Sequence, residues 1–124
     1  MTKFKSQGFN NTFKNARKGF RLVIKSEKNL RIHLVAASCV LSLALILQFS
    51  ALEFCILLLT ISNVIVAEML NTAIEFALDS IYHNRYSRMV GMAKDISAGA
   101  VMFATTISAI IGCIIFGKAI WDLF

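Results

Sequence analysis

The sequence predicts an all-α membrane protein, in which an N-terminal amphipathic surface helix precedes three transmembrane helices. Of its 124 residues, 57% are hydrophobic, only 16% are charged and none is proline. In ordinary soluble domains about a quarter of the residues are charged. Two uncharged runs, 32–52 and 96–117, contain 21 and 22 residues. Roughly 20 mainly apolar residues cross a hydrocarbon core of about 30 Å, so we expect one integral-membrane domain over residues 1–124.

Residues 8–27 are predicted to form an amphipathic helix that lies on the membrane surface. On a helical wheel, one stripe is apolar and the neighbouring sector is basic. The apolar stripe contains Phe9, Phe13, Ala16, Phe20, Val23 and Ile24, and the basic sector contains Lys14, Arg17, Lys18, Arg21 and Lys25. Aromatic and basic faces on one helix suit an interface with anionic lipid. The alternative is a soluble core helix, for which the rest of the chain offers little to pack against.

Three spans are predicted at residues 31–49, 53–75 and 95–118. The second span is long enough only if it includes Glu68, because just 14 uncharged residues separate Glu53 from Glu68. Residues 1–31 contain nine of the 13 basic residues, the 80–94 loop contains three, and residues 49–53 contain none. Basic residues favour the cytoplasmic side. We therefore expect the N-terminus and the 80–94 loop in the cytoplasm and the C-terminus outside, so the net charge of +6 does not indicate nucleic-acid binding.

Small residues open the third span, in the sequence AKDISAGA at 93–100. Small residues allow helices in a membrane to approach closely, which predicts a tightly packed bundle or an oligomer. The three cysteines, Cys39, Cys55 and Cys113, fall inside the apolar spans, where we expect unpaired packing residues rather than disulfides or metal ligands.

A polar stripe lies at the end of the second span. On one helical face, within roughly 100°, the spacing gathers Glu68, Asn71, Thr72, Glu75 and Asp79. An acidic residue at mid-membrane costs at least about 2.5–3.5 kcal/mol on insertion scales, so it indicates function. The alternative is a polar seam that joins helices, which would explain Asn71 and Thr72 but not three acids on one face.

Glu27 and Asp95 are expected at the same depth as the stripe, so that five of the seven acidic residues share one interface. Like charges held together need a cation or a shared proton. Hard oxygen ligands without paired histidines favour Mg²⁺, which binds one or two carboxylates together with substrate phosphates, and Lys94 is a candidate phosphate partner. This set predicts phosphoryl transfer to a lipid hydroxyl. No GxxxxGK[ST], HRD or DFG motif occurs, so the site must differ from those of soluble kinases.

Two motifs resemble the prokaryotic diacylglycerol kinase family of small integral-membrane lipid kinases. They are EMLNTAIEFALD at 68–79 and GMAKDISAGAV at 91–101. The resemblance extends over nearly the whole chain in helix order and length. It implies a homotrimer whose sites are shared between subunits, in a bacterial cytoplasmic membrane. Residues 26–33, SEKNLRIH, are similar to the undecaprenol kinase branch.

The resemblance also implies roles for individual residues. Glu68 matches the general base that takes the proton from the lipid hydroxyl. Glu27 and Glu75 match the ligands that hold Mg²⁺ on the ATP phosphates. The expected ATP contacts are Glu27, Glu75, Asp79, Lys94 and Asp95, and Asn71 is expected to order the site. For the lipid we expect contacts from Lys18, Arg21, Arg31 and Ser97.

The predicted function is phosphorylation of a membrane lipid hydroxyl that depends on ATP and Mg²⁺. Undecaprenol is the preferred substrate because of the SEKNLRIH segment, and diacylglycerol is the alternative. The competing hypotheses from other classes are a small holin-like pore and a structural scaffold. A pore requires polar residues along a helix through the whole membrane, whereas here they end in the cytoplasmic third. A scaffold leaves the clustered acids unexplained.

Overall fold

The computed structural model describes residues 8–124. Residues 1–7, which contain Lys3 and Lys5 of the predicted cytoplasmic N-terminus, lie outside the described residues. Within residues 8–124 the chain forms four helices: α1 (Phe9–Ser26), α2 (Lys28–Ile46), α3 (Ala51–Tyr82) and α4 (Arg88–Leu123). The all-α prediction is therefore confirmed.

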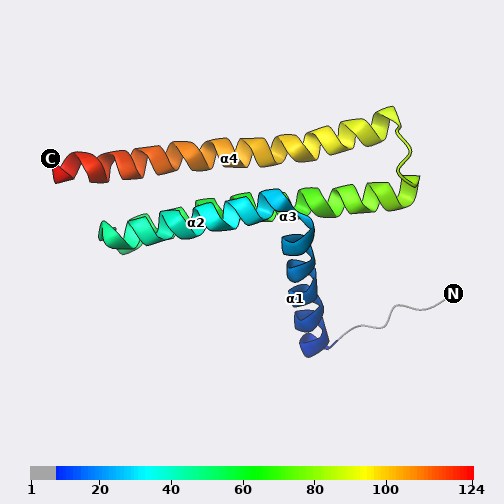
Figure 1. The fold of residues 1–124 in the computed structure, drawn as a ribbon, viewed down its shortest axis with the longest axis horizontal. Coiled ribbons are helices and arrows are strands. Elements are labelled where there is room, and N and C mark those ends of the chain that lie inside the picture. Colours follow the sequence, from blue (N-terminus) through cyan, green and yellow to red (C-terminus); the bar gives the residue numbers. More distant parts are fainter. Residues whose placement is uncertain (1–7) are drawn as a thin grey trace.

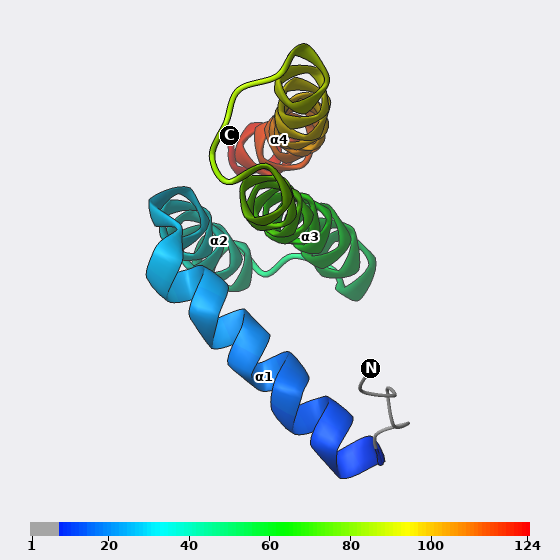
Figure 2. The same cartoon turned by 90° about the vertical axis from the view of Figure 1, so that its right-hand side faces the viewer.

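Helices α2, α3 and α4 run alongside one another, while α1 runs across their common direction (Figure 1). Seen along the three long helices, α3 lies between α2 and α4 (Figure 2). The helices thus form a row rather than a closed three-helix bundle. The C-terminal part of α3 and the start of α4 project past the level of α1 (Figure 1).

Three of the helices, α2, α3 and α4, are long and apolar enough to cross a membrane. The predicted spans 53–75 and 95–118 fall within α3 and α4, and α2 covers most of 31–49. The connection between α3 and α4 is shorter than the predicted 80–94 loop, because residues 80–82 and 88–94 are helical. Because α3 continues to Tyr82, the whole polar stripe from Glu68 to Asp79 lies on one uninterrupted helix.

A sharp corner at Glu27 separates α1 from α2. This residue has an extended backbone, with φ −114° and ψ 111°, and its N–H still donates to the carbonyl of Val23 at 2.9 Å. The Arg31 guanidinium donates to the carbonyls of Ile24 and Lys25 at 2.9 and 2.8 Å. Carbonyls at a helix C-terminus otherwise lack partners. The first turn of α2 thereby holds the last turn of α1 in a fixed direction.

At the opposite end of the row, Ser50 begins α3 with a reciprocal cap. The Ser50 hydroxyl oxygen accepts from the N–H of Glu53 at 3.2 Å and its hydroxyl donates to the Glu53 carboxylate at 3.0 Å. Such an exchange between the N-cap residue and the third helical position satisfies an unpaired N–H at the helix start. Glu53 therefore has a structural explanation that is separate from the polar stripe.

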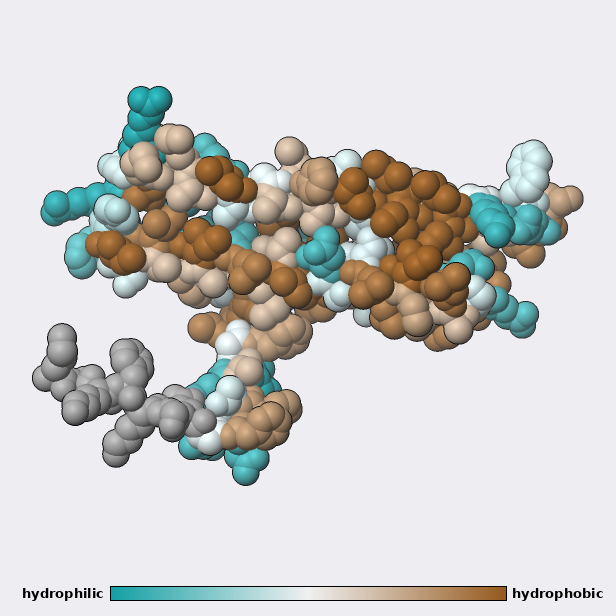
Figure 3. All heavy atoms as spheres, turned by 180° about the vertical axis from the view of Figure 1, so that it is seen from behind, coloured by the Kyte–Doolittle hydropathy of each residue, from teal (hydrophilic) through white to brown (hydrophobic). Residues whose placement is uncertain are grey.

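Few side chains are buried within the described chain. The buried set consists of Val23, Leu30, Ala44, Leu57, Val64, Glu68, Thr72, Val90, Ser97 and Ala104. Apolar atoms dominate the middle of the row, and hydrophilic ones gather at its ends and on α1 (Figure 3). The three cysteines are free and exposed within the described chain. An apolar surface of this extent suits contact with lipid or with another chain rather than with water.

Leu30 provides a test of how α2 is anchored, because its side chain is fully buried at the start of that helix. Leu30→Ala should lower the free energy of unfolding by about 2–5 kcal/mol through the cavity it leaves. The matched control is Leu45→Ala on the same helix, where the side chain is 68% exposed. Unfolding in mixed micelles by titration with a denaturing detergent measures both. Equal, small effects would contradict the anchoring role.

Candidate functional site

The polar stripe of α3 faces the neighbouring helices. Spacings of three and four residues place its members on one face of the helix. Glu68 and Thr72 are buried, with exposures of 6% and 3%, whereas Asn71, Glu75 and Asp79 are half-buried. The stripe therefore passes from an enclosed end at Glu68 to a more open end at Asp79.

The enclosed end of the stripe is paired with a residue of α2. His33 Nε2 lies 3.2 Å from Glu68 Oε1. The side chain of His33 is 27% exposed and that of Glu68 is 8% exposed. A carboxylate so shielded from water requires a polar partner, and the imidazole provides one.

Asn71 joins α3 to α4 at the middle of the stripe. Its amide nitrogen donates to Glu75 Oε1 at 3.3 Å, and its amide oxygen accepts a hydrogen bond from the hydroxyl of Ser97. Ser97 is itself buried. The two contacts fix the amide orientation and hold the Glu75 side chain toward the α3–α4 interface. The site-ordering role of Asn71 stays a prediction.

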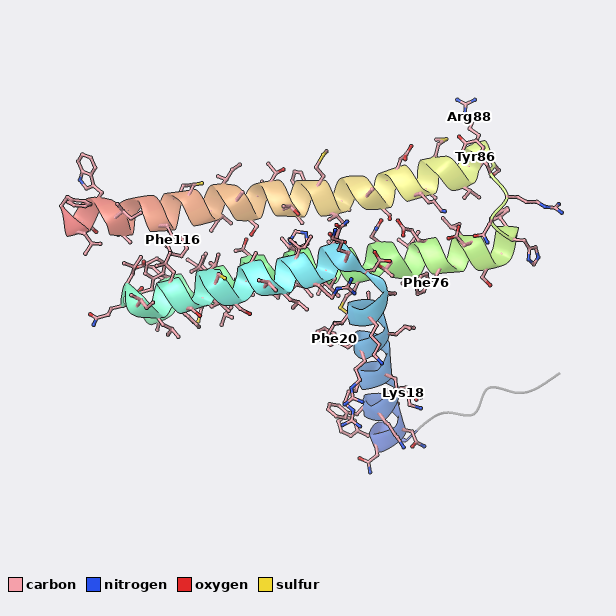
Figure 4. All side chains as sticks on the ribbon, viewed as in Figure 1. Lys18, Phe20, Phe76, Tyr86, Arg88 and Phe116 are labelled. Carbon is pink, nitrogen blue, oxygen red and sulfur yellow. The ribbon has the colours of Figure 1, made fainter. Side chains whose placement is uncertain are left out.

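The open end of the stripe lies beside a polar hollow. Lys94 Nζ donates to Asp79 Oδ1 at 2.6 Å, and both side chains are more than a third exposed. A hollow of about 290 Å³ adjoins this pair, lined by Asp79, Asn84, Arg85, Tyr86, Val90, Gly91, Lys94 and Asp95. Tyr86 and Arg88 lie at the end of the row opposite Phe116 (Figure 4). The Tyr86 ring passes so close to Gly91 that a Cβ there would meet ring carbon Cε2 at 3.0 Å.

Several predicted residues lie away from these contacts. Glu27 is half-buried at the corner between α1 and α2, and Asp95 is exposed at the hollow. Lys18 and Arg21 are exposed on α1, and Figure 4 places Lys18 well away from the row. The guanidinium of Arg31 is engaged by the carbonyls of α1.

No group of three or more histidine, cysteine, aspartate or glutamate residues that could hold a metal ion occurs within residues 8–124. A Mg²⁺ ion bound through one or two carboxylates and the phosphates of a substrate does not need such a group. Glu75 fits this need, because it is half-buried and the Asn71 amide contacts one of its two oxygens.

An apolar groove of about 430 Å³ runs between α2, α3 and α4. His33 lines it, and its lining extends to Phe116, whose ring centroid lies 4.9 Å from that of Phe49. The residues between include Val40, Leu57, Val64 and Ala109. The lining is mainly apolar, and His33 both lines the groove and lies 3.2 Å from the carboxylate of Glu68.

Sequence reasoning missed His33 as a member of the site. A histidine within an otherwise apolar span could have drawn attention to it. The sequence alone, however, does not show which residues of α2 lie beside Glu68. It also left unassigned the loop residues Asn84, Arg85 and Tyr86, which the fold brings beside Asp79 and Lys94.

Residues 14–116 match the family model described as prokaryotic diacylglycerol kinase. An undecaprenol kinase of Bacillus subtilis (strain 168) is 36% identical over 108 residues, which cover 87% of each chain. A diacylglycerol kinase of Synechocystis sp. is 33% identical over 101 residues, 82% of this chain and 58% of the other. A diacylglycerol kinase of Escherichia coli (strain K12) is 31% identical over 107 residues, 86% and 84% of the two chains.

The family match covers most of the chain, from α1 to the C-terminal half of α4, and thus includes the polar stripe, Lys94 and His33. Three relatives above 30% identity agree with it. The chain belongs to the prokaryotic diacylglycerol kinase family, a family of lipid kinases.

Proposed function

We propose that this protein transfers a phosphoryl group from ATP to the hydroxyl of a membrane lipid, with Mg²⁺, and that its preferred substrate is undecaprenol. The observation that carries the proposal is the position of Glu68, a buried carboxylate 3.2 Å from His33, which lines an apolar groove. A lipid whose chain occupies the groove would bring its hydroxyl to the groove end nearest this carboxylate.

We place α1 on the cytoplasmic surface of the membrane as an amphipathic helix. Among its residues only Val23 is buried, and Phe9, Phe13 and Phe20 are 84%, 63% and 39% exposed. The parts of α3 and α4 that project past α1 (Figure 1) would then reach the cytoplasm. They carry Asp79, Lys94 and the polar hollow, where ATP arrives from water. Glu68 would lie below that surface, at the depth of a lipid hydroxyl.

In this arrangement Glu68 is the general base. The lipid oxygen bonds to the γ-phosphorus of ATP while the bond from that phosphorus to the β,γ-bridging oxygen breaks, and ADP leaves. The proton of the hydroxyl passes to Glu68. A positioned base contributes typically about 10²–10⁴-fold to the rate of such a step.

The nucleotide is assigned to the cytoplasmic end of the stripe. Lys94 and Asp79, joined by their ion pair, and Asp95 would contact ATP in the hollow. Glu27 and Glu75 would hold Mg²⁺, which when bound neutralises phosphate charge and aligns the phosphates for transfer. The basic side chains Lys18, Arg21 and Arg31 would meet the polar part of the lipid, and Ser97 would act through its contact with Asn71.

A homotrimer with sites shared between subunits agrees with the small core of a single chain. The three long helices bury few of their residues, and within residues 8–124 no three carboxylates lie together in a group that could hold a metal ion. A partner subunit would cover apolar surface and complete the metal site. A pore is less well supported, because the lining of the groove from His33 to Phe116 is mainly apolar.

The choice of undecaprenol is supported by the SEKNLRIH segment and by the Bacillus subtilis relative. Purified protein with ATP, Mg²⁺ and either undecaprenol or diacylglycerol tests it directly by comparison of kcat/KM. A higher value for diacylglycerol would reverse the assignment and leave the lipid kinase activity intact.

Glu68→Gln keeps the size of the side chain and its capacity to accept a hydrogen bond, but it cannot act as a base at neutral pH. We expect kcat to fall by at least about 10²–10⁴-fold, with the affinity for ATP nearly unchanged. Transfer of labelled phosphate from ATP to lipid in micelles measures the rate. Glu53→Gln at the α3 cap is the matched control, and a Glu68→Gln rate within tenfold of wild type would remove the base role.

Glu75→Gln and Glu27→Gln test the metal ligands. Each removes a negative charge that would attract Mg²⁺, so the Mg²⁺ concentration that gives half-maximal rate should rise by at least about tenfold. The dependence on lipid concentration should stay the same. Titration of the kinase rate with MgCl₂ at fixed ATP measures the effect, with Glu53→Gln again as the control. An unaltered magnesium requirement in both variants would exclude the site.

The surface helix is tested by replacing Phe9, Phe13 and Phe20 with serine together. These side chains would set the depth of α1 and hence the position of Glu27 at its end, so we expect a clear loss of kinase activity in a protein that still inserts and assembles. The control variant carries Lys14→Gln and Arg17→Gln. It should lose little, because each basic residue contributes about 1 kcal/mol at an anionic surface and seven others lie within residues 1–31. Full activity of the serine variant would make α1 a dispensable anchor.

A further inference from the structure

We propose that His33 is a positioning residue for Glu68, one that fixes the carboxylate so that a single oxygen is left to take the lipid proton. This inference rests on the proposed function of Glu68 as the base. The observation behind it is the 3.2 Å distance between His33 Nε2 on α2 and Glu68 Oε1 on α3.

Within the described chain, His33 is the only side chain that forms a hydrogen bond or ion pair with Glu68. A shielded carboxylate with no partner is costly and adopts several rotamers. His33 Nε2 lies 3.2 Å from Oε1, so an imidazole with its proton on Nε2 would donate to that oxygen and limit the rotamers of the Glu68 side chain. The second oxygen, Oε2, keeps its lone pairs for the hydroxyl of the substrate.

His33 is itself held in place from the preceding turn of α2. Leu30, three residues earlier, has no exposed surface, and Arg31 binds the last carbonyls of α1. The backbone that carries His33 is therefore anchored to the corner at Glu27. Positioning of a base by a third group that is itself fixed is a recurrent feature of activated nucleophiles.

The His33 imidazole also lies beside the apolar groove. His33 lines the apolar groove on one side and contacts Glu68 on the other. A lipid chain in the groove would bring its hydroxyl past the imidazole to reach Oε2. We therefore expect His33 to act on the rate of the chemical step rather than on the binding of ATP, which is assigned to the far end of the stripe.

Four variants of the full-length protein test the role in micelles, with ATP, Mg²⁺ and whichever of undecaprenol or diacylglycerol the wild type phosphorylates faster. His33→Leu removes the donor, and we expect kcat to fall by roughly 10–100-fold while KM for ATP is unchanged. His33→Gln keeps an N–H near the position of Nε2 and should retain most of the activity. His33→Asn is one carbon shorter, so its amide falls short of Glu68 and its rate should resemble that of His33→Leu. Ser38→Ala, which removes a hydroxyl that bonds only within α2, is the control.

The Gln and Asn variants both keep a polar amide, so their comparison decides the question even if His33→Leu does not assemble. Equal rates for Gln and Asn, or a His33→Leu variant with wild-type kcat, would overturn the positioning role. A double variant gives a further test. In a Glu68→Gln background His33→Leu should have little additional effect, because the residue it positions is no longer a base. A full additional loss would show that His33 acts independently of Glu68.

The two proposals fail in different ways. A wild-type protein that phosphorylates neither lipid overturns the proposed function and this inference with it. An active wild type, an inactive Glu68→Gln variant and unaffected His33 variants overturn the inference alone.

Discussion

The burial of one carboxylate in a membrane helix governs the rest of this structure. Glu68 has only 8% of its side-chain surface exposed, in a helix long and apolar enough to span a bilayer. A charge at such a place is tolerated only with a partner and a path toward water. His33 supplies the partner, and the stripe that continues through Asn71, Glu75 and Asp79 leads to the open end of α3. The remaining polar contacts of the site, made by Asn71 and Asp79, lie along this stripe between Glu68 and the open end.

Two kinds of contact organise the site, and they connect different helices. Between α2 and α3 the link is His33 with Glu68. Between α3 and α4 the links are Asn71 with Ser97 and Asp79 with Lys94. Because α3 lies between the other two helices (Figure 2), its polar stripe carries both the contact with α2 and the contacts with α4. In the proposed enzyme, the lipid end and the nucleotide end of the reaction are thereby coupled through one helix.

The sequence was enough to predict the features that depend on a single helix. Uncharged runs located two of the apolar helices and the inclusion of Glu68 located the third, and the helical period placed Glu68, Asn71, Glu75 and Asp79 on one face. The sequence did not predict the contacts between helices. Whether His33 meets Glu68 depends on the relative depth and rotation of α2 and α3, neither of which a periodic pattern contains. The hollow beside Asp79 depends on the turn at His83 and Asn84, where both residues have positive φ, and on Tyr86 folding over Gly91. The small residues of 93–100 predict a tightly packed bundle or an oligomer, and the sequence does not decide between them; within residues 8–124 the three long helices form a row (Figure 2).

Because α3 is unbroken, it fixes the distance between its N-terminal cap and Glu68. It starts at the Ser50 cap, 18 residues before Glu68, and at 1.5 Å per residue this corresponds to about 27 Å. The hydrocarbon core of a bilayer is about 30 Å thick. In the proposed orientation the outer cap therefore fixes Glu68 at the inner margin of the hydrocarbon, where a prenyl or acyl chain ends and its hydroxyl begins. A thicker bilayer would draw that hydroxyl away from the carboxylate unless the helices changed their tilt, since mismatch is relieved by tilting or by local deformation of the lipid. In the proposed orientation, the thickness of the surrounding membrane therefore affects the distance between the Glu68 carboxylate and the lipid hydroxyl.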